Sequence, residues 1–118
     1  MLNKNVTFLK ILLTELDDLE EKVNLLLNNT RERFAKGEIS NYVFLENCAT
    51  QENQILRIKH LAEEIKKMNP WDYDSPDDII NNVLHMIQNE INKENLSEFS
   101  IEIIRKKMEK IKNYVETE

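Results

Sequence analysis

Residues that interrupt regular secondary structure are rare in this chain. Its 118 residues include one glycine, Gly37, and two prolines, Pro70 and Pro76. A protein built from many short strands needs many turns, and these residue types are the usual material of turns. Few turns, together with abundant Leu, Ile, Glu and Lys, are typical of long helices. The sequence therefore predicts an all-α protein, and its length predicts a single domain over residues 1–118.

The first long stretch carries an apolar heptad repeat. Its apolar positions step alternately by three and four residues, the a/d pattern of a coiled coil, and they are Leu9, Leu12, Leu16, Leu19, Val23 and Leu26. Gly37 marks the end of the stretch, because glycine readily adopts the left-handed conformation that follows a helix C-terminus. We expect a helix over residues 6–36.

A second helix is expected over residues 40–68. Ser40 is a suitable N-cap, and Ile39 and Phe44 have the spacing of a hydrophobic staple. The apolar stripe continues to Pro70, which disfavours a helical residue before it, and its members are Phe44, Cys48, Gln51, Ile55, Ile58, Ala62 and Ile65. The two helices should form a long antiparallel hairpin in which the numbers of facing residues add up to about 77.

Two shorter helices complete the expected bundle. Ser75 and Pro76 read as the N-cap and first residue of a helix over 76–92. The polar run at residues 92–95 breaks its apolar stripe, and a fourth helix over 97–116 follows in a shifted frame, capped by Asn95 or Ser97. No Gly or Pro enforces this break, so one continuous bent helix is the alternative.

The charge and the cysteine count restrict the possible partners and the compartment. A net charge of −6 makes the chain a poor phosphate binder, since nucleic-acid affinity comes largely from Lys and Arg. The exception is the basic stretch at residues 105–112, which makes a nucleic-acid-associated regulator an alternative function. Cys48 is the only cysteine, so an internal disulfide is impossible and a reducing, cytoplasmic location is expected. No apolar run is long enough to cross a membrane.

The search for catalytic, cofactor-binding or metal-binding residues finds none. Metal sites in four-helix bundles use Glu-x-x-His motifs. Here Arg57 stands three residues before His60, and Asn82 three before His85. The sequence therefore favours a non-enzymatic protein without cofactors, and a small all-α enzyme with an unrecognised pocket is a further alternative.

Helix lengths predict a contact surface at the tip of the hairpin. At 1.5 Å per residue the first two helices are about 45 Å long and the last two about 25–30 Å, so the tip should lack cover from its own chain. Cover by shifted third or fourth helices, or by a bent first helix, is the alternative. The apolar residues expected to be exposed there are Leu25, Leu27, Phe34, Tyr42, Phe44 and Leu45.

Two aromatic residues of the connecting loop complete the candidate surface. Trp71 and Tyr73 are expected either to cap the open end of the bundle or to anchor a partner. The expected partner is a second copy of the chain, because twofold homodimers are the commonest oligomers. The sequence thus predicts an interaction, regulatory or adaptor module that dimerises through the hairpin tip.

Overall fold

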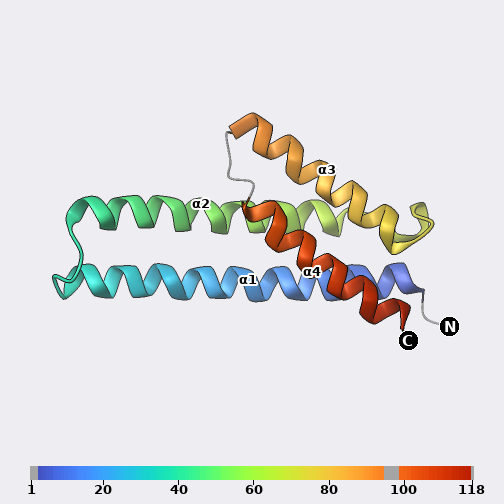
Figure 1. Cartoon of the computed structure of the whole chain (residues 1–118), viewed down its shortest axis with the longest axis horizontal. Helices are drawn as coiled ribbons and strands as arrows, with labels where there is room; N and C mark the ends of the chain where they lie inside the picture. The colour runs from blue at the N-terminus through green and yellow to red at the C-terminus, as the bar shows by residue number, and fades with distance from the viewer. Residues whose placement is uncertain (1–2, 95–98, 118) are drawn as a thin grey trace. The chain divides into compact units, whose positions relative to one another are not determined.

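The computed structural model describes residues 3–94 and 99–117, which are helical throughout apart from short connections and contain no strand. The α-helices in these ranges are α1 (Lys4–Ala35), α2 (Asn41–Lys66), α3 (Pro76–Glu94) and α4 (Phe99–Glu116), and a 3-10 turn, η1, spans Pro70–Asp72 (Figure 1). The all-α class is therefore confirmed.

The chain divides into two compact units. One, here called the terminal unit, comprises Met1–Glu15 and Glu64–Glu118 and so contains the start of α1, the end of α2, η1, α3 and α4. The other, the turn unit, is Leu16–Glu63 and contains the rest of α1 and α2 with the turn that joins them.

Helix α1 begins two residues earlier than the apolar pattern indicated, because an asparagine caps it. The side-chain Oδ1 of Asn3 accepts hydrogen bonds from the backbone N–H groups of Asn5 at 2.8 Å and Val6 at 3.4 Å. These N–H groups would otherwise lack partners in the first turn. The predicted start at residue 6 is thus corrected to Lys4.

The turn between α1 and α2 has the caps that the sequence predicts. Gly37 has φ of +74°, and the N–H groups of Gly37 and Glu38 donate to the carbonyls of Phe34 and Arg33 at 3.0 and 2.9 Å. This is the Schellman arrangement of a helix C-terminus. Ser40 Oγ then accepts from the N–H of Val43 at 3.2 Å, which confirms Ser40 as the N-cap of α2.

Helix α2 ends at Lys66, two residues before the expected end. The N–H groups of Lys67 and Met68 donate three residues back, to Glu64 and Ile65, so the last turn is tightened. Asn69 then caps η1, its Oδ1 accepting from the N–H of Trp71 at 3.1 Å.

Helix α3 starts at Pro76 as predicted, with Asp77 and Asp78 in its first turn. It extends to Glu94, and α4 begins at Phe99 and packs against α3. This contact excludes a single continuous bent helix. The predicted cap residues Asn95 and Ser97 lie outside the described part of the chain.

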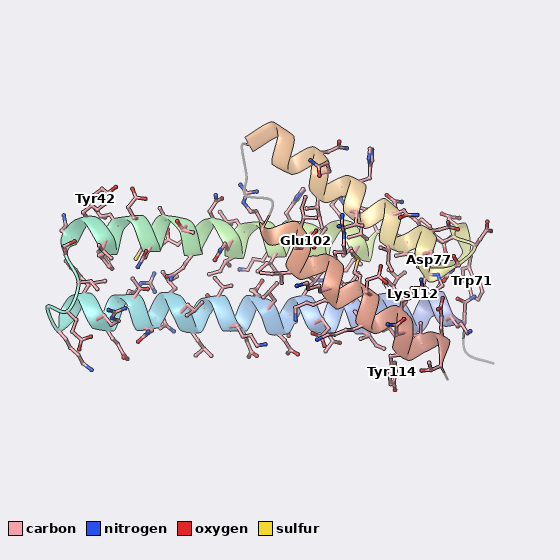
Figure 2. The ribbon with its side chains drawn as sticks, viewed as in Figure 1. Tyr42, Trp71, Asp77, Glu102, Lys112 and Tyr114 are labelled. Carbon is pink, nitrogen blue, oxygen red and sulfur yellow. The ribbon has the colours of Figure 1, made fainter. Side chains whose placement is uncertain are left out.

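The terminal unit has a tightly packed core that draws on several helices. Among its described side chains, those less than 2% exposed are Phe8, Leu12, Ile65, Ile79, Val83 and Met108. Salt bridges lie at the margin of this core: Lys107 Nζ of α4 is 3.2 Å from Glu15 Oε2 of α1, and Lys112 Nζ is 2.7 Å from Asp77 Oδ1 of α3. Figure 2 shows Asp77 and Lys112 next to each other.

The buried face of α1 in the turn unit differs from the predicted heptad. Leu27 is 6% exposed and Leu26 is 53% exposed, so the predicted membership of Leu26 is wrong. A straight helix has about 3.6 residues per turn, and five turns after Leu9 reach position 27 rather than 26. The heptad assignment assumed 3.5 residues per turn, and the difference accumulates along the helix.

Contacts near the turn show which residues of the two segments of this unit meet. The rings of Phe34 and Phe44 are in contact, and their numbers add up to 78, close to the predicted sum of about 77. Long side chains also reach further along α2: the buried Thr30 hydroxyl lies 3.1 Å from Gln51 Oε1, and Arg31 forms a salt bridge 3.8 Å long with Glu52.

Candidate contact surface

Large apolar side chains that face solvent are concentrated in the turn unit. Of the nine that the structure describes, seven belong to it and two, Trp71 and Tyr114, belong to the terminal unit. The seven are Leu25, Leu26, Phe34, Tyr42, Val43, Leu45 and Leu56. Exposed apolar residues that gather on one region, rather than lying singly, mark contact surfaces.

Helix α2 carries the most regular part of this surface. Tyr42, Leu45, Ala49 and Leu56 follow one another at intervals that keep them on one side of the helix, and all are exposed. Asn53, also exposed, occupies the same side between Ala49 and Leu56. We call these five residues the outer stripe. It contains no charged residue.

The outer stripe lies on the side of α2 opposite to its packed face. At 100° per residue, the packed face defined by Phe44, Gln51 and Ile58 points about 180° away from Tyr42 and Ala49. Those three side chains are partly or fully buried. Figure 2 shows Tyr42 on the side of α2 turned away from α1. Helix α2 thus has two apolar faces, and its own chain packs only one of them within this unit.

The two phenylalanines nearest the turn stack on each other. The rings of Phe34 and Phe44 stack with centroids 4.2 Å apart and planes inclined by 10°. Phe44 is half-buried, and Phe34 is 37% exposed. Both were predicted to face a partner, and the stack leaves them with less free surface than Tyr42, which is 72% exposed.

The exposure of the leucines of α1 requires a correction. Leu27, predicted to be part of the contact surface, is buried within its own chain, because it occupies the packed face of α1. Leu25 is exposed as predicted, but the residues one turn away on either side, Glu21 and Asn29 among them, are polar. Leu25 therefore does not belong to an apolar stripe along α1, and its exposed apolar neighbour is the adjacent Leu26.

The two aromatic residues of the loop differ in their exposure to solvent. Trp71 is 71% exposed, so the interpretation that it covers the open end of the bundle is wrong. Tyr73 is half-buried, and its hydroxyl accepts a hydrogen bond from Asn82 Nδ2 at 2.7 Å. Tyr73 thus ties the loop to α3.

Sequence reasoning missed Asn5, which holds the same loop. Asn5 is 5% exposed, and its Nδ2 donates to the carbonyls of Tyr73 at 2.7 Å and Pro70 at 3.1 Å. Buried amides of this kind satisfy backbone groups that a loop would otherwise leave unpaired. No periodic pattern could reveal this role, because the partners lie more than sixty residues away in the chain.

The basic stretch at residues 105–112 is mostly engaged within its own unit. Arg105 pairs with Glu102 at 2.9 Å, Lys107 with Glu15 and Lys112 with Asp77. The hydrogen bond to Asp77 raises the pKa of Lys112 above its usual value, and partial desolvation opposes this effect. A Lys or Arg side chain that pairs with a carboxylate of its own chain contributes less to phosphate binding.

Titratable side chains in the described part of the chain do not gather as metal ligands. In residues 3–94 and 99–117, no three His, Cys, Asp or Glu side chains gather in a way that could hold a metal ion. Cys48, on the packed face of α2, is a half-buried free cysteine. None of the helices described has the length and hydropathy needed to span a bilayer.

Comparison with known proteins provides no relative. The chain matches no family model, no curated protein and no solved structure. Function must therefore be inferred from the surface itself.

Proposed function

We propose that this protein is a non-enzymatic interaction module, of the regulatory or adaptor type, that forms a homodimer through the turn unit. The observation that carries the proposal is the concentration of seven of the nine described, exposed large apolar side chains in this unit. Uncovered apolar surface is unfavourable in water, and a second copy would remove it from solvent.

The proposal includes a finer description of the fold and of the location. In it, α1 and α2 form one long antiparallel hairpin within a single domain, and α3 and α4 complete a bundle at the open end. The helix lengths support this, with 32 and 26 residues in α1 and α2 against 19 and 18 in α3 and α4. The single cysteine supports a reducing compartment such as the cytoplasm.

Two substitutions on the outer stripe test the proposed function. Tyr42→Asp combined with Leu45→Asp places two charges where the proposal puts an apolar interface. Both side chains are exposed, so folding should survive the change. We expect sedimentation equilibrium to give the mass of a dimer for the wild type and that of a monomer for the double variant.

A matched control comes from the terminal unit. Tyr114 is 54% exposed on α4, and Tyr114→Asp should leave the mass of the dimer unchanged. A wild-type chain that sediments as a monomer at every accessible concentration would contradict the proposed function. Dissociation caused by Tyr114→Asp and not by the double variant would place the interface elsewhere.

A further inference from the structure

We propose that residues 31–50, here called the apical segment, open as a separate cooperative unit while the rest of the turn unit stays folded. The segment comprises the last turn of α1, the connection at Gly37 and the first turns of α2 (Figure 1). This inference goes beyond the proposed function, because it concerns the motion of a single chain. Three features support it: the burial along the turn unit, the contacts within the segment, and a polar layer at its base.

Burial within the turn unit stops short of the apical segment. Every residue from 31 to 50 is described, and each one is partly or fully exposed to solvent. The rest of the turn unit contains six buried apolar side chains, which are Leu16, Val23, Leu27, Ile55, Ile58 and Leu61. Burial of apolar surface is the main favourable term in folding, and segments with few buried apolar contacts open at a low free energy. The apical segment therefore resists opening less than the remainder of its unit.

The contacts that join α1 to α2 within and beside the apical segment are weak. The rings of Phe34 and Phe44 stack with centroids 4.2 Å apart, but both rings are partly exposed. The salt bridge between Arg31 and Glu52 is 3.8 Å long, and both side chains are more than half exposed. Exposed ion pairs contribute little to stability, since water solvates both charges when the pair separates. The segment is thus held closed mainly by one ring stack.

A polar contact stands in place of an apolar one at the base of the segment. Thr30 is 6% exposed; its hydroxyl donates to the carbonyl of Leu26 at 3.0 Å and lies 3.1 Å from the side-chain amide of Gln51. Gln51 belongs to the packed face of α2, between Cys48 and Ile55. When the segment opens, water replaces the partners of Thr30 and Gln51, so breaking their contact costs less than separating two apolar side chains. This polar layer divides the packed face into two parts.

Opening changes what the segment presents to its surroundings. In the closed form Phe34 and Phe44 cover part of each other, and Cys48 is half-buried. In the open form both rings and the thiol become accessible, in addition to Tyr42 and Leu45, which are already exposed. The polar layer and the ring stack therefore form a conformational device that covers and uncovers the second apolar face of α2.

Hydrogen exchange of the wild-type chain, read by mass spectrometry, tests the opening. The amides of residues 44–50 lie within α2, so their exchange requires the segment to open. We expect them to exchange at least about a hundredfold faster than the amides of residues 55–62, and with less dependence on urea, because a smaller opening exposes less surface. Equal rates and equal urea dependence in the two ranges would overturn the inference.

Two substitutions separate a local opening from unfolding of the whole unit. Val23→Ala removes buried methyl groups from the part that stays folded, so it should speed exchange in residues 55–62 about tenfold and leave residues 44–50 unchanged. Phe44→Ala removes the ring stack and should speed exchange in both ranges, because either opening breaks the stack. If Val23→Ala speeds both ranges equally, the segment opens only with the rest of its unit, and the inference is wrong.

Replacement of the polar layer tests its role. Thr30→Val combined with Gln51→Leu introduces apolar side chains of similar size, which should pack together and slow exchange in residues 44–50 about tenfold. Thr14→Val is the matched control: the Thr14 hydroxyl makes the same kind of bond, to the carbonyl of Lys10 at 3.1 Å, but is exposed, so the rates should not change. A double variant with normal helix content and wild-type exchange would show that the layer does not limit the segment.

The outcomes separate this inference from the proposed function. All chains are compared as monomers, by dilution or in the Tyr42→Asp/Leu45→Asp background, so that a second copy does not cover the apical segment. A chain that never dimerises but exchanges fast in residues 44–50 contradicts the proposed function and supports the opening. A dimerising chain whose monomer exchanges at equal rates in both ranges does the reverse.

Discussion

The two units of this molecule use apolar residues in opposite ways. In the terminal unit most of those described are buried, with Trp71 and Tyr114 as exposed exceptions: six of the seven large side chains less than 2% exposed lie there, and only Leu16 lies in the turn unit. In the turn unit, by contrast, apolar residues occupy both the packed and the outer side of α2. Several helices contribute to the first unit and two segments to the second, so the number of helices available decides how much apolar surface can be covered.

The largest expected effect is the loss of a core side chain from the terminal unit. Phe8 is fully buried, and Phe8→Ala should lower the free energy of unfolding by about 3–5 kcal/mol through lost burial and a cavity. Urea denaturation at fixed protein concentration measures the change. Leu25→Ala, on an exposed site of the same helix, is the control and should change stability by less than about 0.5 kcal/mol.

The next effect separates two adjacent leucines of the turn unit. Leu27→Ala should cost about 2–4 kcal/mol, because Leu27 is buried, whereas Leu26→Ala should cost little. The measurement is again urea denaturation. If both variants lost the same free energy of unfolding, the turn unit would pack loosely on both sides of α1. The contrast between the buried and the exposed leucine would then be contradicted.

A polar contact of the terminal unit should have a smaller effect. Asn5→Ala leaves the carbonyls of Pro70 and Tyr73 without their donor, at an expected cost of about 1–3 kcal/mol. Hydrogen exchange should also become faster in residues 69–75. Asn24→Ala, an exposed asparagine of α1 in the turn unit, serves as the control; if both variants behave alike, Asn5 does not hold the loop.

The smallest effect concerns pH. The pKa of Lys112 is raised in the folded state by Asp77, so the stabilisation is present in full below the ordinary lysine value of 10.5 and is lost as the pH rises through the raised pKa. The difference in melting temperature between the wild type and Asp77→Asn should be constant from pH 8 to 10 and decline above 10.5. A difference that does not change up to pH 12 would show that the pair adds nothing to the terminal unit.

Local signals in the sequence were sufficient for the helices and for several of their ends. Gly37, Ser40 and Pro76 act through the conformation and hydrogen bonds of neighbouring backbone, so their roles can be inferred from a few residues of context. The same holds for the packed face of α2, where the predicted residues from Phe44 to Ile65 are all partly or fully buried.

Only the tertiary structure decided which apolar residues are covered. Leu26 and Leu27 are chemically identical neighbours, and the accumulated difference between 3.5 and 3.6 residues per turn placed one in the core and the other in solvent. Trp71, for which covering the end of the bundle was one expectation, is exposed, and Asn5, for which the sequence indicated no role, is buried because its partners lie more than sixty residues away in the chain. Periodicity is a property of one helix and can be read from the sequence directly. Burial depends on which other segments lie against that helix, so it is known only once the chain has folded.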